Sequence, residues 1–140
     1  MAEFVFKNAY LSVNAKDLSD HVKSLTLNDG VETGDNTAMG DNVRSAMAGL
    51  LQQSVEVEFH SDWTTDKTND VIDPLVGAAA FALIVKPNGS VTSATNPKWS
   101  GNVILSAWRP FGGAVGTTPS SSTATFIPGD GTGLVRAEAD

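Results

Sequence analysis

The stretch DNTAMGDNVRSAMAGLLQQSVEVEF (residues 35–59) is a long polar loop that runs into a strand of strict alternation. Successive side chains of a strand point to opposite faces of a sheet, so Glu56 and Glu58 are expected to face away from the core. The residues expected to face the core are Val55, Val57 and Phe59. This stretch predicts a sheet with one face in water, next to a loop that has the composition of a partner-binding surface.

Length and composition limit the classes of protein that remain possible. The chain has 140 residues, 41% of them hydrophobic, a size typical of one domain with its own core. We therefore expect a single domain over residues 1–140. The absence of cysteine excludes disulfides, thiolate metal sites and cysteine nucleophiles, and is typical of a reducing compartment. The first ten residues lack the basic and apolar segments of a secretory signal, so export by that route is not expected.

Eight short segments have the composition of strands. They are residues 3–7, 9–13, 21–27, 54–60, 81–86, 103–109, 123–127 and 134–137. Asparagine and glycine lie close together between some of these segments, and we predict that residues 28–30 and 88–90 close hairpins or tight reversals. The chain is thus expected to be mainly antiparallel β. The segments FALIVK and NVILSAWR are apolar on both faces, which predicts that each face is covered by another sheet, a helix or a neighbouring subunit.

One short helix is expected at about residues 67–77. Asp70 and Asp73 suit the positive end of a helix dipole. Pro74 cannot donate a backbone hydrogen bond, so the segment is either a short helix or two turns kinked at this proline. Leu75 is expected to join the core.

A polar loop is expected at about residues 34–49. Residues 41–51 carry apolar side chains at helix-like spacing, but two glycines weaken that pattern and we read the segment mostly as loop. The strand after the short helix is expected to add Phe81 and Leu83 to the core.

The patterns that indicate chemistry are weak. Glu56 and Glu58 would lie roughly 6–7 Å apart on one strand face, a spacing that an inverting glycosidase uses but that alternation alone produces. Neither histidine accompanies a nucleophile motif such as G-x-S-x-G. The densest set of possible metal ligands lacks a calcium-loop or zinc spacing; this set is His60, Asp62, Asp66, Asp70 and Asp73. The glycine-rich segments 110–116 and 128–133 lack the phosphate-loop pattern. We therefore expect no enzyme, no cofactor and no metal.

The charge balance argues against two further classes of partner. Sixteen acidic residues against nine basic ones give a formal charge of −7, with no dense cluster of Lys or Arg to neutralise a phosphate backbone. The longest uncharged apolar run, residues 75–85, is far shorter than the roughly 20 residues of a membrane-spanning helix. An acidic surface can still face nucleic acid where its task is to repel it.

Several segments, taken in order, resemble the major tail tube proteins of long, non-contractile-tailed bacteriophages. They are AEFVFKNAYLSVNAKDLSDHVKSLTL, DNTAMGDNVRSAMAGL followed by SVEVEF, PLVGAA, VTSATNPKWSG, PFGGAVG and TATFIPGDG. The resemblance covers nearly the whole chain, although each motif alone is weak. It implies an antiparallel β-sandwich or barrel-like fold with one short flanking helix and a long inter-ring loop.

The resemblance also implies a function and a set of contacts. The chain would form rings, usually hexameric, that stack into the tail tube through which DNA passes without adhering. It would meet tape-measure and tail-tip proteins in the virion, assemble in the host cytoplasm and involve no membrane. The residues implied as contacts between rings are Asp35, Met39, Asp41, Arg44 and Met47. Glu56 and Glu58 become candidates for the lining of the lumen.

Two other classes of protein fit the same observations. Another virion component, such as a tail terminator or a decoration protein, would share the β-rich acidic composition without polymerising. A monomeric carbohydrate-binding β-sandwich would use exposed tryptophans, of which the candidates are Trp63, Trp99 and Trp108.

Overall fold

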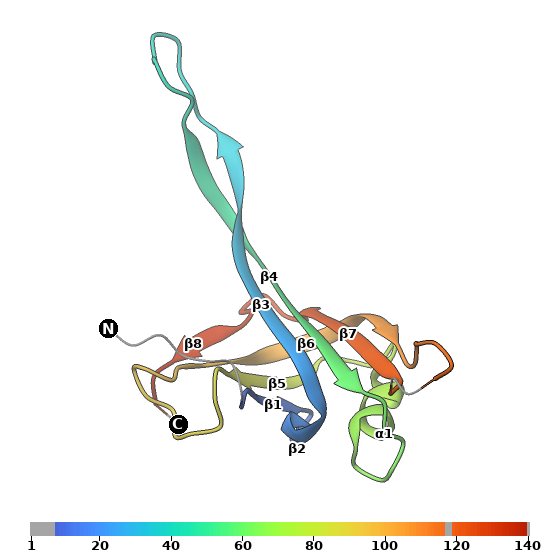
Figure 1. Ribbon diagram of the computed structural model, residues 1–140. Coiled ribbons are helices and arrows are strands. Elements are labelled where there is room, and N and C mark those ends of the chain that lie inside the picture. Colours follow the sequence, from blue (N-terminus) through green and yellow to red (C-terminus); the bar gives the residue numbers. More distant parts are fainter. Residues whose placement is uncertain (1–7, 117–118, 140) are drawn as a thin grey trace.

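The computed structural model describes residues 8–116 and 119–139, and its sheet is shown in Figure 1. Its strands are β1 (Tyr10–Val13), β2 (Lys16–Asp17), β3 (Val22–Asp35), β4 (Ala46–His60), β5 (Phe81–Lys86), β6 (Lys98–Arg109), β7 (Ser121–Pro128) and β8 (Val135–Ala137). The helical segments are η1 (Ser19–His21), α1 (Thr68–Ile72) and η2 (Asp73–Leu75). The predicted strand at residues 3–7 lies outside the described residues.

The strands form one antiparallel sheet in the order β2-β1-β5-β6-β7-β4-β3, and β8 pairs with β6 beside this path. The expectation of a mainly antiparallel β fold with one short helix is confirmed. β1 and β4 are not neighbours in the sheet, yet their side chains are buried in the same core cluster, which shows that the sheet curls. Closing a sheet around its own side chains gives it the barrel-like character that the resemblance implied.

The core lies inside this curl. The side chains expected there are all buried, with at most 8% of their surface exposed; they are Val55, Val57, Phe59, Leu75, Phe81 and Leu83. Phe81 packs edge to face on Phe126 of β7, with ring centroids 5.9 Å apart. Burying each such side chain contributes about 1.5–3 kcal/mol before the entropy cost of ordering it. The alternation read from β4 thus describes its packing directly.

The helical segment is a short helix that continues as a 3-10 turn. α1 ends at Ile72 and η2 begins at Asp73, so Pro74 occupies the first turn of η2, where its missing N–H costs little. Asn69 ties this segment to the sheet: its Oδ1 accepts the Asp62 N–H at 2.8 Å, and its Nδ2 donates to the Pro110 carbonyl at 2.7 Å.

Two expectations about turns and loops are wrong. Residues 28–30 do not close a hairpin, because they lie inside β3, where Asn28 pairs with Ser54 and Gly30 with Gln52. The loop is shorter than residues 34–49, since β3 runs to Asp35 and β4 begins at Ala46. The turn propensity of Asn-Asp-Gly is local, and pairing along the whole of β4 overrides it. The reversal occurs at residues 36–45, where Gly40 has a φ of +99°.

Among the described residues, neither another sheet nor a helix covers the second face of the two apolar strands, and cover by a neighbouring subunit stays a prediction. On β5, Phe81, Leu83 and Val85 are buried, whereas Ala82 is exposed and Ile84 is half-buried. The same holds for the second face of β6, since no second sheet of the described residues lies over it. A single curled sheet covers only its inner face.

Candidate assembly surface

The hairpin of β3 and β4 extends well beyond the rest of the sheet (Figure 1). β4 pairs with β7 only from Val55 to His60, while it pairs with β3 up to Ala46. We call residues 30–52 the arm. Among the described residues, the two strands of the arm therefore pair only with each other. Apolar side chains along the arm are exposed: Val31, Met39, Val43, Met47, Leu50 and Leu51.

Gln53 fixes the base of the arm to the body. Its Nε2 donates to the Leu134 carbonyl at 3.0 Å, and its Oε1 accepts the Leu134 N–H at 2.8 Å, so the amide pairs with the backbone as a strand would. Nε2 also lies 3.1 Å from Oδ1 of Asp29. Gln53 is 8% exposed, and the sequence reasoning missed it. The available signal was a glutamine at a core-facing position of the alternation that contains Val55 and Val57.

The core-facing side of the hairpin continues into the arm. Val31 lies directly opposite Leu51, two positions along the alternation from Gln53 and Asp29. Leu25 and Leu27, farther down β3, pack against the core, whereas Val31 and Leu51 are 40% and 67% exposed. The same face therefore changes from core to open surface as the strands leave the body.

The tip, residues 36–45, is closed by its own hydrogen bonds. Ser45 donates its N–H to the Thr37 hydroxyl at 2.8 Å and its own hydroxyl to Oδ1 of Asn36 at 2.6 Å. Asp41 Oδ2 accepts the Ala38 N–H at 2.8 Å. Arg44 pairs with Asp35 at 2.8 Å. Hydrogen bonds from the Thr37 side chain and backbone, and then Arg44, hold the pKa of Asp35 below its ordinary value.

These contacts place the five implied inter-ring residues. Arg44, in the tip, pairs with Asp35 at the end of β3, and both side chains remain exposed. Met39 is fully exposed at the end of the arm, and Met47 is 58% exposed on its side. Asp41 is exposed, and one of its oxygens stabilises the turn.

Glu56 and Glu58 lie on the outer face of β4, as the alternation predicted. Their cross-strand neighbours are hydroxyl residues: Thr26 and Thr125 beside Glu56, Ser24 and Thr123 beside Glu58. Lys23 Nζ lies 3.3 Å from Oε1 of Glu58. Arg109 continues the row that contains Glu58, beyond Thr123. This face therefore carries cations as well as the two carboxylates, and of the two carboxylates only Glu56 has no ion pair among the described residues.

The acids considered as metal ligands make separate contacts. Asp73 accepts both indole N–H groups of Trp63 and Trp108, and Asp66 pairs with Lys16 at 3.4 Å. Asp62 contacts His21. Across residues 8–116 and 119–139, no group of three or more His, Asp or Glu side chains is arranged to hold a metal ion. In the same ranges, no helix has the length and hydropathy needed to cross a bilayer.

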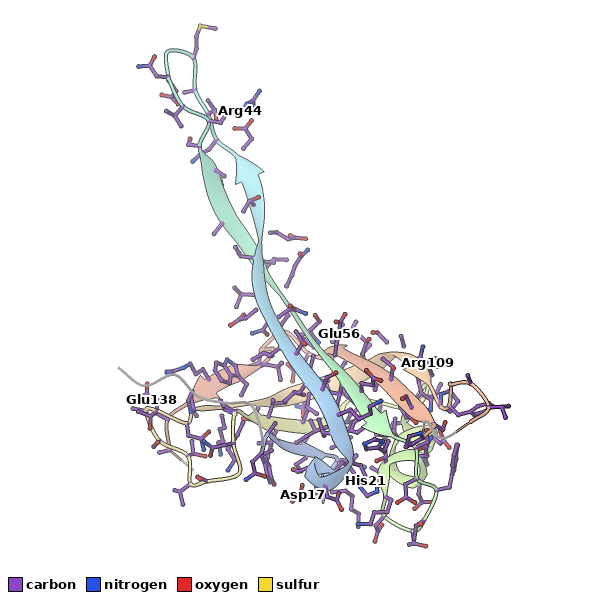
Figure 2. The ribbon with its side chains drawn as sticks, viewed as in Figure 1. Asp17, His21, Arg44, Glu56, Arg109 and Glu138 are labelled. Carbon is purple, nitrogen blue, oxygen red and sulfur yellow. The ribbon has the colours of Figure 1, made fainter. Side chains whose placement is uncertain are left out.

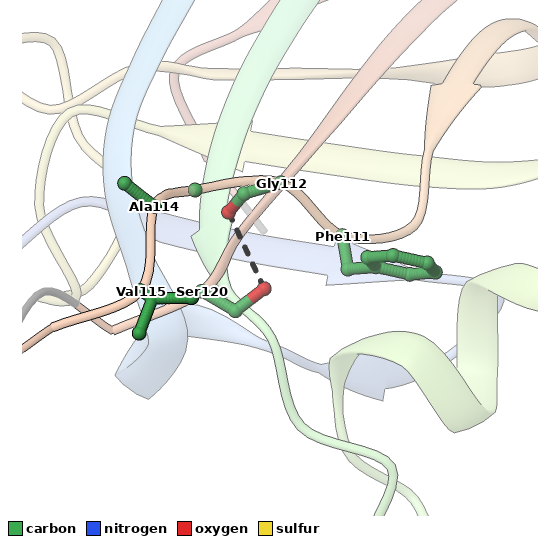
Figure 3. Close-up of a pocket in the computed structure, with 6 residues that line it drawn as sticks. Phe111, Gly112, Ala114, Val115 and Ser120 are labelled. Carbon is green, nitrogen blue, oxygen red and sulfur yellow. Dashed lines mark hydrogen bonds between the residues drawn. The ribbon is translucent and has the colours of Figure 1, made fainter.

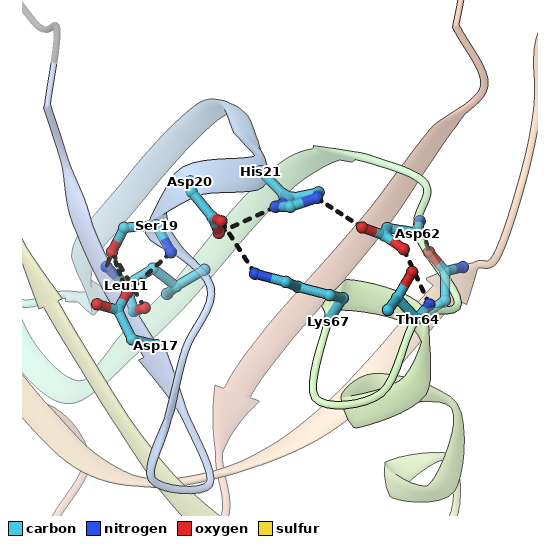
Figure 4. Close-up of polar contacts among 9 residues, drawn as sticks. Leu11, Asp17, Ser19, Asp20, His21, Asp62, Thr64 and Lys67 are labelled. Carbon is cyan, nitrogen blue, oxygen red and sulfur yellow. Dashed lines mark hydrogen bonds and ion pairs between the residues drawn. The ribbon is translucent and has the colours of Figure 1, made fainter.

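His21 lies in a charged network that joins the start of β3 to the segment before α1 (Figure 4). Its Nε2 is 2.8 Å from Oδ2 of Asp62, and its Nδ1 is 2.9 Å from Oδ1 of Asp20, without hydrogen-bond geometry at that nitrogen. Lys67 pairs with Asp20 at 3.2 Å. Contact with Asp20, and then with Asp62, raises the pKa of His21, and burial opposes this.

Solved structures with a similar fold come from tail-like particles. No protein-family model matches the sequence, and no curated protein does. A chain of a sheath/tube terminator structure from an extracellular contractile injection system, PVC, in the extended state, aligns with a TM-score of 0.71 at 12% identity over 98% of both chains. A chain of the native gene transfer agent (GTA) virion aligns with a TM-score of 0.69 at 13% identity, over 96% of this chain and 99% of that one. A chain from the tail of an empty GTA particle, determined by helical refinement with C6 symmetry, gives 0.64 at 11% identity, over 86% and 83%. This likeness shows a shared fold.

Proposed function

We propose that this chain is a structural virion protein of one domain, without enzymatic activity, that polymerises into stacked rings forming a phage tail tube. The observation that carries the proposal is the arm, whose apolar side chains are exposed and whose strands pair only with each other among the described residues. Contiguous exposed apolar surface of this kind marks interaction sites. The likeness to chains of tail particles supports a self-assembling role, and the C6 symmetry of one such tail supports hexameric rings.

In the proposed tube the arm reaches from one ring to the next, with Met39, Asp41 and Met47 at its contact. Asp35 and Arg44 stabilise the tip and present one charge of each sign. Edge strand β3 offers unpaired backbone groups to a neighbour within the ring. The half-buried second face of β5 and β6 is a further contact surface. Burial of its apolar area between subunits would offset the charge repulsion between them.

The lumen would be lined by the outer face of β4, where Glu56 repels DNA and Glu58 is partly neutralised by Lys23. The overall charge of −7, repeated around each ring, supports non-adhesive passage. Tape-measure and tail-tip proteins would be the other partners, and the host cytoplasm the place of assembly.

A tube terminator is a second candidate, favoured by the alignment over 98% of a chain from a sheath/tube terminator structure. A terminator would form one ring and stop, whereas a tube protein would continue to stack.

Negative-stain electron microscopy of the concentrated protein separates these functions. Tubes of variable length support the tube protein, single rings support the terminator, and a strictly monomeric protein would reject both. A variant in which Asn-Gly replaces residues 36–45 tests the arm, because this pair closes a two-residue hairpin without the tip. We expect it to fold and to lose stacking; tubes of unchanged length would show that the tip is not the contact.

A further inference from the structure

His21 contacts a carboxylate through each of its ring nitrogens. Asp20 precedes it in η1, and Asp62 lies between β4 and α1, 41 positions farther along the chain. The His21 side chain is 19% exposed, against 26% for Asp62 and 59% for Asp20. Figure 2 shows His21 on the body, at the opposite end of the hairpin from Arg44. The ring therefore stands between two negative charges, one of them more open to water than the other.

The two contacts of the ring differ in kind. Nε2 of His21 and Oδ2 of Asp62 lie 2.8 Å apart in hydrogen-bond geometry. Nδ1 lies 2.9 Å from Oδ1 of Asp20, but this buried nitrogen has no hydrogen-bond partner in the described part of the chain. The contact with Asp62 is therefore a directed bond, whereas the contact with Asp20 is an ion pair that depends on the charge of the ring.

The protonation state of the ring decides which contact is favourable. A neutral imidazole has one N–H group and one lone pair, whereas an imidazolium has two N–H groups. The bond to Asp62 favours the neutral tautomer with its proton on Nε2. Nδ1 then presents a lone pair to a carboxylate oxygen, and the attraction to Asp20 is lost. Only the imidazolium attracts both carboxylates, in agreement with the raised pKa of His21, for which contact with Asp20 is the largest cause.

Asp62 is held in place independently of the ring. Its Oδ1 accepts the Thr64 N–H at 2.9 Å, and its backbone N–H donates to Oδ1 of Asn69 at 2.8 Å. Ser61, the residue before it, donates its N–H to the Ser120 carbonyl at 3.1 Å. Figure 3 shows Ser120 hydrogen-bonded across the neighbouring turn. Asp62 thus keeps its position when the charge of the ring changes.

Asp20, in contrast, has a second cation within reach. Lys67 Nζ lies 3.2 Å from Oδ2 of Asp20, while His21 contacts Oδ1. Because most of the Asp20 side chain is exposed, it can turn toward Lys67 and water without giving up a buried contact. Other charged groups at this end of the hairpin make contacts of their own: Lys23 with Glu58, Lys16 with Asp66, and Asp17 with Ser19.

We propose that His21 is a proton-controlled switch that selects the partner of Asp20. The imidazolium bridges Asp20 and Asp62. When Nδ1 gives its proton to water, the neutral ring keeps Asp62 and releases Asp20 to Lys67 and to solvent. The exchange leaves one more net negative charge beside Val22, the first residue of β3. This inference concerns a single chain and stands whether or not the chain assembles.

NMR spectroscopy of protein labelled with 15N in its two histidines, His21 and His60, tests the switch directly. Spectra are recorded from pH 5 to pH 9 on the dissociated protein, or by magic-angle spinning on an assembled one. We expect the His21 ring to be an imidazolium at pH 5 and to carry its single proton on Nε2 at pH 9. Through-space contacts from the ring should reach the β-protons of Asp20 and Asp62 at pH 5, and only those of Asp62 at pH 9.

Several results would overturn the switch. One is a neutral ring with its proton on Nδ1, since the directed bond to Asp62 would then be absent. Loss of the Asp62 contact at pH 9, or persistence of the Asp20 contact there, would also contradict the proposed exchange. A His21 ring that is already neutral at pH 5 would show that the imidazolium bridge does not form.

Asp20→Asn gives a second measurement with a matched control. The amide keeps the size of the carboxylate and removes its charge, so the affinity of His21 for its proton should fall about two- to fivefold, the range of a partly exposed ion pair. Asp17→Asn removes a carboxylate of β2 that bonds Ser19, and should leave the His21 titration unchanged. Circular dichroism checks that both variants are folded. Equal shifts in the two variants, or no shift in Asp20→Asn, would show that the ring does not respond to Asp20 and would refute the switch.

Discussion

The β3–β4 hairpin has a lower half within the body of the sheet and an upper half, the arm. Both halves have the same alternation of side chains, but the lower half is buried on one face and the upper half is exposed. In the lower half, Val55 and Val57 are at most 1% exposed, because β7 and the curled sheet close over them. In the upper half, Leu51 continues the same face but is 67% exposed, because β3 is the only strand beside it in the described part of the chain. Apolar alternation therefore identifies a face that needs a partner, and does not say whether the partner is in the same chain.

Two matched leucine-to-alanine substitutions test the difference between the two halves and have the largest expected effect. Leu83→Ala removes a fully buried side chain and should lower the free energy of unfolding by about 2–5 kcal/mol, since a cavity remains. Leu51→Ala should change it by less than about 0.5 kcal/mol, because the side chain is already in water. Urea denaturation of the dissociated protein measures both. If Leu51→Ala destabilised the isolated chain as much as Leu83→Ala, the arm would belong to the core of the chain, and its proposed role as a contact would fall.

Substitutions of two adjacent glutamines test the junction between the two halves. Gln53→Ala leaves the N–H and carbonyl of Leu134 without their amide partner and should cost about 1–3 kcal/mol. Gln52→Ala removes only an exposed contact to Glu32, with Nε2 3.1 Å from Oε1, and should cost less than about 0.5 kcal/mol. Hydrogen exchange at Leu134, with and without each substitution, is the accompanying measurement. Equal effects of the two substitutions would mean that Gln53 does not hold the arm to the body.

Sequence patterns predicted the features that rest on local periodicity. The burial of Val55, Val57 and Phe59, and the outward direction of Glu56, follow from alternation alone. The turn at residues 28–30 was wrong because pairing with β4 is a long-range effect that a local motif does not report. The sequence did not predict the length of the arm for the same reason, because that length depends on pairing between β3 and β4.

The contact between Trp63 and Phe111, like the base of the arm, depends on residues that are distant in the sequence. Trp63 and Phe111 are 48 positions apart in the chain, and their rings meet beside the hydrogen bond by which Asn69 joins the helical segment to Pro110 after β6. No spacing in the sequence encodes that meeting. The exposed tryptophan was recognised as a possible ring platform, but its indole N–H is taken by Asp73, which changes the kind of partner it fits.

His21 lies at the end of the hairpin opposite the tip, and its substitution has the smallest expected effect on stability. Its raised pKa means that the protonated form is stabilised by Asp20 and Asp62 in the folded chain. This contribution is fully present below the unfolded value of 6.5 and is lost as the pH rises through the folded pKa. Asp20 and Asp62 have lowered pKa values, so their contributions are present above 3.8 and are lost as the pH falls through their folded values. Lys67 adds a second cation to Asp20.

His21→Asn should therefore lower the free energy of unfolding near pH 6 by less than about 1 kcal/mol, because the partners are partly exposed, and should lower it by less still near pH 9. The matched control is His60→Asn at the exposed end of β4. Urea denaturation at both pH values measures the difference from the unsubstituted protein. A His21→Asn penalty that stays constant or grows with pH would show that His21 acts through packing, since only a protonated imidazole attracts both carboxylates and only its loss of charge weakens that attraction.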